Sequence, residues 1–338
     1  MASCGGPGIL YTLATESPRS NRNLPDELTV TAVVSAGSHY YVAAGGMWRR
    51  AHAGDTWQPV TRPAQLLVLG LAAAGDTLCA GTVRGVYRAE AGESPSWDPA
   101  SGVPDTEQVL RVFTIPGPFE TEILAVTQPQ EDETAYRVYR SVRDCSNFEP
   151  LAVLQDESGH PFDATYAFGG YWVTVGDRLF RGATLDSLEA AEVELDGSGP
   201  LRGVFGNDSR DRLYVADESG RIHFSEDGRS WSSARIQPPA DDMEAVPLTL
   251  FTQIGGTILI GTKGFGFYQF EDGAPDRAER GPRITSQLYE AHITGFAQFE
   301  HFDGGHRKKI AFAATAVAGL SSLYVDEVEG NFGTWNWE

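Results

Sequence analysis

The chain has 338 residues and a formal net charge of −20, because 46 acidic residues outnumber 26 basic ones. A surface this acidic repels nucleic-acid backbones and anionic lipid headgroups, so it disfavours nucleic-acid binding and favours solubility. The sequence contains no run of 18 apolar residues and therefore predicts no transmembrane segment.

Residues 1–27 read as a flexible leader, and 28–338 as a single domain. The leader's "ASCGGPG" places small residues before Cys4, as at the lipidation site of bacterial lipoproteins, but without the apolar stretch that precedes such a site. We expect a periplasmic or cell-surface lipoprotein, with a cytoplasmic chain and an incidental cysteine as the alternative. Three cysteines are too few for a disulfide-stapled fold, and Cys79 within "TLCAGT" is predicted to be a core residue.

A unit of about 44 residues recurs along the domain. Each copy predicts a strand, a tight hairpin, a second strand, a glycine turn, a third strand, a polar turn and a last strand. The first strands of the copies fall near 29–34, 66–72, 109–115, 163–168, 201–206, 247–254 and 293–299. A single unit of this size cannot bury its apolar face without neighbouring units packed against it. We therefore predict an all-β propeller of seven four-stranded blades arranged around an axis. Six blades remain the alternative if the degraded fourth copy is an insertion.

Two segments could close the predicted ring. "ILYTLATES", at 9–17, could pair with the last blade and protect its open edge, or "GTWNWE" at the end of the chain could supply the outermost strand unaided.

The polar turn between the third and fourth strands is best preserved in "IHFSEDGRSWSSA". Ser225 and Asp227 can bond turn amides, Gly228 permits a backbone conformation closed to other residues, and Trp231 can pack over the turn. We therefore predict a structural role for these residues.

This S-x-D-G-x-S-W spacing resembles the Asp-box, or BNR repeat, of sialidase-superfamily and photosystem II assembly-factor-like propellers. The resemblance covers nearly the whole chain, although only this copy of the box is intact: Ala91 and His52 stand where the second and first copies would carry the aspartate. It implies a propeller with the box on the outer rim, away from the central channel.

The residues of sialidase catalysis are absent. Sialidases carry an early Arg-Ile-Pro segment, whereas the nearest string here, Arg283-Ile284-Thr285, comes late and lacks the proline. A glycoside hydrolase would need two carboxylates facing one cleft, and 46 acidic residues allow no choice of a pair from sequence.

We predict no metal site and no cofactor. The weak metal candidates are His301, Asp303 and His306, which lie with Glu300 in "EHFDGGHRKK". Their spacing matches no established ligand pattern, and the Gly304-Gly305 pair favours an exposed hairpin between the first two strands of the last blade.

The remaining candidates for binding lie on the predicted inner strands and edges. Arg111 in "VLRVF" and Arg202 in "LRGVF" occupy innermost-strand copies, where each could hold a carboxylate in the central channel or pair with an acid of a neighbouring blade. Trp48 and Trp172 could be contact aromatics or could pack between blades.

The sequence thus favours a non-catalytic binding or scaffold propeller that engages a protein or a glycan through one face, with no nucleic-acid partner and a possible lipid anchor. A carbohydrate-active enzyme with its site at the channel is the alternative. Oligomeric state is left open.

Overall fold

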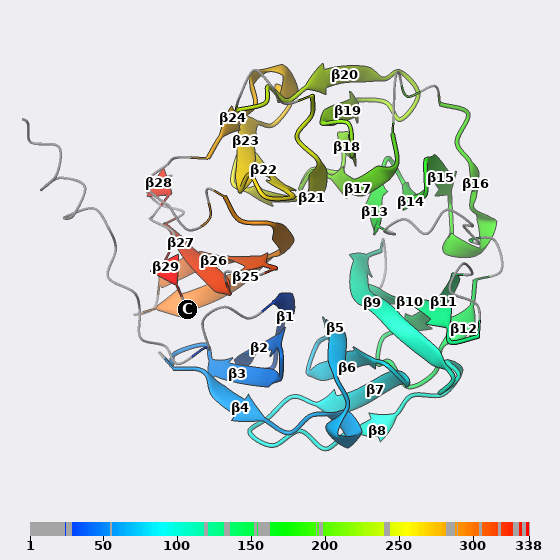
Figure 1. The fold of residues 1–338 in the computed structure, drawn as a ribbon, viewed down its shortest axis with the longest axis vertical. Helices are drawn as coiled ribbons and strands as arrows, with labels where there is room; N and C mark the ends of the chain where they lie inside the picture. Colours follow the sequence, from blue (N-terminus) through cyan, green and yellow to red (C-terminus); the bar gives the residue numbers. More distant parts are fainter. Residues whose placement is uncertain are drawn as a thin grey trace, which may run out of the picture.

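Each of the seven predicted units folds into an antiparallel sheet whose strands follow one another in chain order, and the seven sheets stand around a central opening (Figure 1). The structure is a computed structural model, and it describes residues 24, 29–54, 56–117, 121–131, 136–151, 154, 163–193, 195, 199–239, 244–281, 288, 290–303, 306–316, 319–326, 331–332 and 336–337. The chain is therefore a seven-bladed β-propeller, as predicted.

The strands of the first four blades are as follows. Blade 1 comprises β1 (Val30–Ala36), β2 (His39–Ala44), β3 (Met47–Ala51) and β4 (Gln58–Val60). Blade 2 comprises β5 (Val68–Ala74), β6 (Thr77–Thr82), β7 (Gly85–Glu90) and β8 (Asp98–Pro99). Blade 3 comprises β9 (Glu107–Pro116), β10 (Thr121–Pro129), β11 (Arg137–Val142) and β12 (Glu149–Pro150). Blade 4 comprises β13 (Asp163–Ala167), β14 (Gly170–Val175), β15 (Arg178–Gly182) and β16 (Glu189–Ala190).

The last three blades complete the ring. Blade 5 comprises β17 (Leu201–Gly206), β18 (Leu213–Asp217), β19 (Arg221–Ser225) and β20 (Ser232–Arg235). Blade 6 comprises β21 (Leu248–Ile254), β22 (Thr257–Thr262), β23 (Phe267–Glu271) and β24 (Glu279–Arg280). Blade 7 comprises β25 (Ile293–Asp303), β26 (His306–Thr315), β27 (Leu320–Asp326), β28 (Asn331–Phe332) and β29 (Asn336–Trp337). Short 3₁₀ turns occur at Pro63–Gln65, Leu185–Ser187 and Pro275–Arg277.

The degraded fourth copy is a complete blade, so the six-bladed alternative is wrong. Its weak polar turn is replaced by a 3₁₀ turn at Leu185–Ser187, which still leads into an outermost strand, β16. Tight hairpins connect the first two strands of blades 2 and 6, where Gly75 and Gly255 both adopt a φ of +59°. This left-handed backbone is open to glycine at little cost, which is why the hairpins could be read from sequence.

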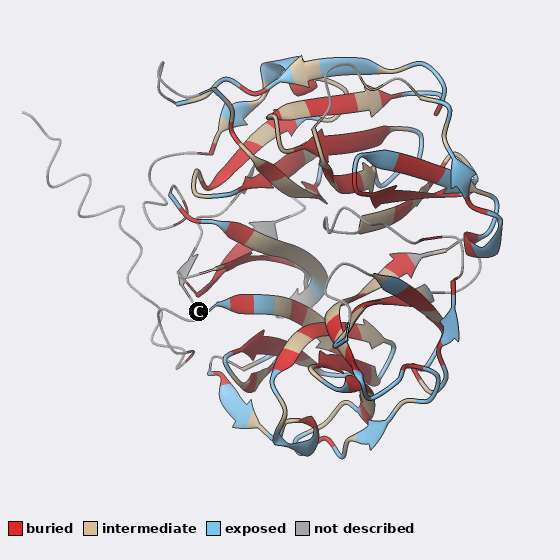
Figure 2. Ribbon diagram, turned by 45° about the vertical axis from the view of Figure 1, so that its right-hand side comes forward, coloured by how far each residue is buried: buried red, intermediate tan, exposed pale blue. Residues whose placement is uncertain are grey.

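Burial follows the radial position of each strand (Figure 2). The second strand of a blade is almost wholly buried, as in β2, β6 and β22, whereas the outermost strands β4, β8, β12 and β16 are mostly exposed. The apolar runs of the sequence thus form the second strands, and the core consists of apolar clusters that bridge neighbouring blades.

Blade 1 packs directly on blade 7 and so closes the ring (Figure 1). The Thr294 hydroxyl donates to the carbonyl of Val30 at 2.7 Å, and Tyr40 meets Phe312 edge-on with ring centroids 5.2 Å apart. Both β28 and β29 pair with β27, so the last residues of the chain supply the outermost strands of blade 7. The segment at 9–17, proposed as a closing strand, lies outside the described residues.

Two faces of the ring can now be distinguished. On one face, here called the connection face, each innermost strand begins and the second strand of each blade turns into the third. On the other, the hairpin face, lie the turns between the first and second strands and between the third and fourth. Among the described residues, no helix is long and apolar enough to cross a membrane.

Candidate functional site

The innermost strands enclose a cavity of about 940 Å³ at the centre of the ring. Its described lining carries four cationic side chains but only two acidic ones; these are Arg111, Arg202, Arg210 and Lys263, against Asp163 and Asp208. Aromatic side chains add apolar surface, among them Phe113, Tyr166, Phe205, Phe251, Phe296 and Phe299. The described lining of the channel is therefore net positive, although the chain as a whole has a formal net charge of −20.

Local backbone irregularity helps to place these side chains. The strand pairing slips near the start of the innermost strand, between Leu201 and Gly203 in blade 5 and at the matching points of blades 1, 2, 6 and 7. Arg202 is the residue left out of the pairing. Such a bulge re-aims a side chain, and here it brings the guanidinium to the cavity wall.

Arg111 takes part in a contact through which Asp163 links three blades at the channel wall. Its guanidinium lies 3.4 Å from a carboxylate oxygen of Asp163 on β13 and 4.7 Å from the ring centroid of Phe113. The other Asp163 oxygen accepts a hydrogen bond from the amide of Val204 on β17 at 3.1 Å. Burial raises the pKa of Asp163, although the charge of Arg111 and the Val204 amide oppose that rise. Arg111 thus pairs with an acid of the neighbouring blade.

Arg202 lies on the connection-face side of the channel, in a second polar group. Its guanidinium bonds the carboxylate of Glu218, just beyond β18, and the ammonium of Lys263, just beyond β22, donates to the same oxygen at 2.8 Å. Burial would raise the pKa of Glu218, but the hydrogen bonds from Lys263 and Arg202 hold it below its usual range. Burial, with the charge of Lys263, lowers the pKa of His292, another residue of the cavity lining.

One polar atom of this group has no partner within the described part of the chain. The Arg202 side chain is 9% exposed, and its Nε is buried without a hydrogen bond. A buried donor of this kind costs free energy until an acceptor reaches it. The group therefore carries two positive charges, one resident carboxylate and spare capacity to donate.

The two tryptophans proposed as contact residues differ in burial. Trp172 is 2% exposed, donates to the carbonyl of Ala167 at 3.1 Å and meets Trp231 edge-on, so it packs between blades 4 and 5. Trp48 is half-buried, donates to the carbonyl of Ala44 at 3.3 Å and packs against the cluster shared by blades 1 and 7. Neither lines the central cavity.

The S-x-D-G-x-S-W turn is held by its own side chains. The Ser225 hydroxyl accepts from the Gly228 amide at 2.8 Å, and one Asp227 oxygen accepts from the amides of Arg229 and Ser230, both at 2.7 Å. Gly228 has a φ of +68°, and these donors lower the pKa of Asp227 to about 2. The turn lies on the hairpin face between β19 and β20, outside the described cavity lining, and these hydrogen bonds all stay within the turn.

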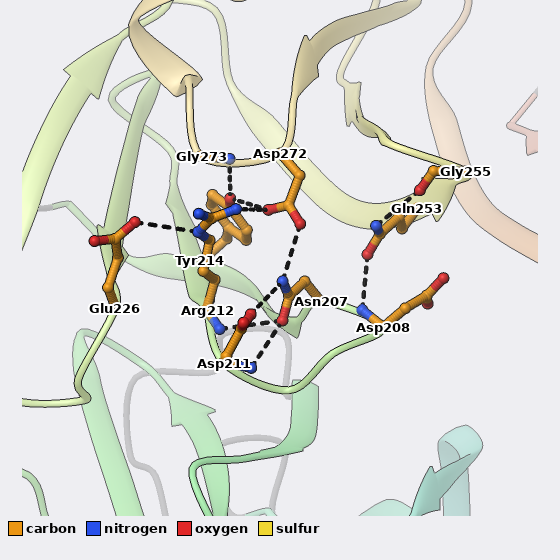
Figure 3. Close-up of polar contacts among 10 residues, drawn as sticks. All are labelled: Asn207, Asp208, Asp211, Arg212, Tyr214, Glu226, Gln253, Gly255, Asp272 and Gly273. Carbon is orange, nitrogen blue, oxygen red and sulfur yellow. Dashed lines mark hydrogen bonds and ion pairs between the residues drawn. The ribbon is translucent and has the colours of Figure 1, made fainter.

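A polar network on the same face ties blade 5 to blade 6 (Figure 3). Asn207 donates to the carboxylate of Asp272 at 2.9 Å, the Tyr214 hydroxyl donates to the other oxygen at 2.6 Å, and the guanidinium of Arg212 lies 3.4 Å from that oxygen. Arg212 also donates to Glu226 at 3.2 Å. Because both oxygens of Asp272 are bound by side chains of blade 5, the network fixes blade 5 to blade 6.

The metal candidates fall on the β25–β26 hairpin that the sequence predicted. Asp303 pairs with His306, and His301 pairs with Lys308 further along the two strands. Only the backbone is described at these positions. Elsewhere in the described chain, no group of three or more metal-ligating side chains comes together.

The cysteines require a correction. Cys79 is a fully buried core residue, as predicted, but it forms a disulfide with Cys145, with Cα atoms 6.1 Å apart. The count of three cysteines argued against a disulfide framework, yet a single bond needs only two, and these lie 66 residues apart in sequence. Cys4, the proposed lipidation site, lies outside the described residues.

The sequence indicated two of the four cationic residues of the channel, Arg111 and Arg202, and did not indicate Arg210, Lys263, Asp163 or Glu218. A signal for two of these exists: Glu218 and Lys263 each follow the second strand of their blades directly, so alignment of these turns would have placed both at the channel mouth.

No protein-family model and no curated protein sequence matches this chain. Among solved structures, YCF48 from Cyanidioschyzon merolae has a TM-score of 0.59 at 13% identity, covering 88% of this chain and 96% of that one. YCF48 bound to D1 peptide has a TM-score of 0.61 at 14% identity, covering 91% and 95%. The WD40 β-propeller domain of Doa1 has a TM-score of 0.56 at 11% identity, covering 95% and 98%.

These likenesses show the fold alone. At such identities they carry no partner, ligand or activity over to this chain.

Proposed function

We propose that the protein is a non-catalytic binding propeller that holds a segment of a protein partner at the connection-face mouth of its channel. The observation that carries this proposal is the reversal of charge in the cavity, where Arg202 and Lys263 share one carboxylate and a buried Arg202 nitrogen has no partner within the described chain. The excess of positive charge and the Lys263 ammonium, whose side chain is 40% exposed, suit an anionic group, and acidic side chains are the commonest such group on a protein segment.

The shape and lining of the cavity support a peptide-like ligand. Six aromatic rings line it beside the cations, which suits a segment that combines apolar side chains with a carboxylate. That one structural neighbour, YCF48, has been solved with a D1 peptide agrees with this mode of use. The finer assignment also belongs here: we propose that the blades are decayed Asp-box repeats, with the turn at Ser225 as the intact copy.

The hydrolase alternative has less support. Hydrolysis of a glycoside needs two carboxylates about 5 to 10 Å apart on either side of the bond. The two acids of the described cavity lining are Asp163, bound to Arg111 and Val204, and Asp208, which lies in the hairpin-face turn beyond β17 and whose amide donates to Gln253. These two side chains lie towards opposite faces of the ring and make separate contacts. The described cavity lining therefore offers no facing pair of carboxylates for glycoside hydrolysis.

We also propose that the protein works outside the cytoplasm. Support comes from the disulfide between Cys79 and Cys145, because structural disulfides persist mainly in oxidising compartments. Cell fractionation with an antibody to the protein tests this: recovery in the periplasm or at the cell surface supports it, and recovery with cytoplasmic markers contradicts it. Labelling with a radioactive fatty acid in wild type and Cys4→Ala would report on the lipid anchor.

The binding proposal is tested on an array of peptides of graded acidity and on a glycan array, with the same labelled protein. We expect acidic peptides with apolar neighbours to bind, and the binding to weaken about tenfold or more in Lys263→Gln and to fall with added salt. Arg229→Gln is the matched control, because it removes a cation from the hairpin face and should bind like wild type. Binding to glycans only, or equal loss in both variants, would overturn the proposal.

A further inference from the structure

We propose that the Cys79–Cys145 disulfide forms while the chain folds and is then sealed between blades 2 and 3, out of reach of reductants in the native protein. The proposal does not rest on the proposed binding function. It starts from the burial of the two cysteines, since both are 0% exposed to solvent.

Both cysteines occupy special positions. Cys79 lies in the middle of β6, opposite Ala72 of the innermost strand and Arg88 of β7. Cys145 lies in the turn between β11 and β12, with a φ of +55°. A left-handed cysteine is uncommon, and the turn adopts this conformation where it brings the side chain against the neighbouring blade.

The same contact recurs elsewhere in the ring without a covalent bond. Tyr41 pairs with Val34 and Tyr214 pairs with Phe205, each at the register position that Cys79 holds opposite Ala72. The hydroxyls of Tyr41 and Tyr214 accept hydrogen bonds from the amides of Gly92 and Gly273, in the third-to-fourth strand turn of the next blade, both at 2.7 Å. Between blades 2 and 3 the disulfide joins the same two places.

A segment of blade 2 covers the turn that carries Cys145. The Ser101 amide donates to the carbonyl of Ser146 at 3.0 Å, the Phe148 amide donates to the carbonyl of Ser101 at 2.9 Å, and the Ser101 hydroxyl donates to Asn147 at 2.8 Å. Gly102 fits so closely that a Cβ there would lie 1.8 Å from the Phe148 oxygen. This strap, residues 100–102, is bonded along the turn, and its Ala100 packs against the buried cluster that contains both cysteines.

The other side of the bond is equally closed. Both cysteines belong to one buried cluster of blades 2 and 3, with Val86, Val109 and Phe148 among its members. At the same seam a Cβ on Gly81 would lie 2.5 Å from a methyl carbon of Val109. Close packing of this kind excludes small molecules unless the blades separate.

The chemistry sets the order of events. Two thiols become a disulfide by losing two protons and two electrons, which an external disulfide, such as oxidised glutathione, takes up as it becomes two thiols. That acceptor must first reach one of the two sulfur atoms and form a mixed disulfide with it, and the second cysteine then attacks this mixed disulfide and releases the other thiol. Because both cysteines are 0% exposed in the folded chain, the first step has to occur before the seam and the strap close. The chain is therefore expected to fold where such an oxidant is present.

The test uses the full chain with Cys4→Ala, so that the pair alone reports on thiol content. Protein folded with oxidised glutathione is treated with dithiothreitol, either native or in guanidinium chloride, and free thiols are trapped with an alkylating reagent and located by peptide mass spectrometry. We expect the linked peptide in the native sample and alkylation of both cysteines only after denaturation. Alkylation of the native protein as fast as of the denatured one would overturn the proposal.

A second arm tests the order. Denatured, reduced chain is refolded with oxidised glutathione present throughout or added only after refolding. We expect at least a tenfold slower appearance of the linked peptide with late addition, and equal rates would overturn the proposal. Cys79→Ser/Cys145→Ser should melt roughly 5 °C lower than the oxidised wild type. If that variant does not fold, thiol trapping of the protein that retains both cysteines still tests whether the disulfide is sealed.

Discussion

The Tyr214 hydroxyl in blade 5 accepts a hydrogen bond from the amide of Gly273 in blade 6 at 2.7 Å and donates one to the carboxylate of Asp272 at 2.6 Å (Figure 3). One buried oxygen thus satisfies two groups of the next blade. Asp272 and Gly273 stand where the intact turn carries Asp227 and Gly228, but Phe270 replaces the serine. Where the serine that holds this glycine amide is lost, the neighbouring blade supplies the acceptor.

Tyr214→Phe is expected to lower the free energy of unfolding by about 1–3 kcal/mol, because it removes both the acceptor of the partly buried Gly273 amide and a donor to the carboxylate of Asp272. Denaturant unfolding followed by fluorescence measures the loss. The control is Tyr268→Phe, in which the hydroxyl that donates to the Gln237 carbonyl at 3.2 Å is removed. This control bond also joins blades 5 and 6, but in it the hydroxyl donates to a carbonyl. A loss of stability in the control as large as in Tyr214→Phe would mean that accepting the Gly273 amide adds nothing beyond an ordinary hydrogen bond.

Contacts between side chains of neighbouring blades, such as this one, could not be predicted from the sequence. Blade strands follow from local chemistry, such as the left-handed hairpin at Gly75, and all seven innermost strands fell where expected. Arg111 and Arg202 could be found because they align along one strand of the repeat. The meeting of Arg202 with Lys263, and of Cys79 with Cys145, depends on the angle between successive blades, which no single repeat encodes.

The carboxylate of Asp227 should stabilise the fold in a pH-dependent way. Its pKa is lowered to about 2 from an ordinary value of 3.8, so its contribution is present above the ordinary value and is lost as pH falls through the folded value. We expect the wild type to have a higher denaturation midpoint than Asp227→Asn at neutral pH, with a gap that narrows below about pH 4. A gap that does not change with pH would show that charge has no part in holding the turn.

Asp163 should behave in the opposite sense. Burial raises its pKa despite Arg111, so its favourable contribution is present at acidic pH, below the ordinary value, and is lost as pH rises through the raised folded value. Asp163→Asn can still accept from the Val204 amide but never ionises. We therefore expect wild type to lose stability relative to this variant as pH rises from acidic to neutral, in denaturation series at fixed ionic strength.

The opposite trend would identify the ion pair with Arg111 as the dominant effect. The Arg111 side chain is 38% exposed, so water screens its charge, and this is why we expect burial of Asp163 to prevail.

Two glycine substitutions separate backbone strain from steric closure of the strap. Gly75 has a φ of +59° and open space where a Cβ would stand, so Gly75→Ala should cost about 1 kcal/mol of unfolding free energy. Gly102 has a φ of +92°, and its Cβ would lie 1.8 Å from the Phe148 oxygen, so Gly102→Ala should cost about 3–5 kcal/mol. Chemical denaturation of both variants measures the difference.

Because the strap must shift to admit the methyl group, we expect dithiothreitol to reduce the Cys79–Cys145 bond in native Gly102→Ala but not in native Gly75→Ala. Thiol trapping of the two native variants measures this. Equal losses of stability, or a pair that stays closed in both variants, would show that the strap is not what covers the disulfide.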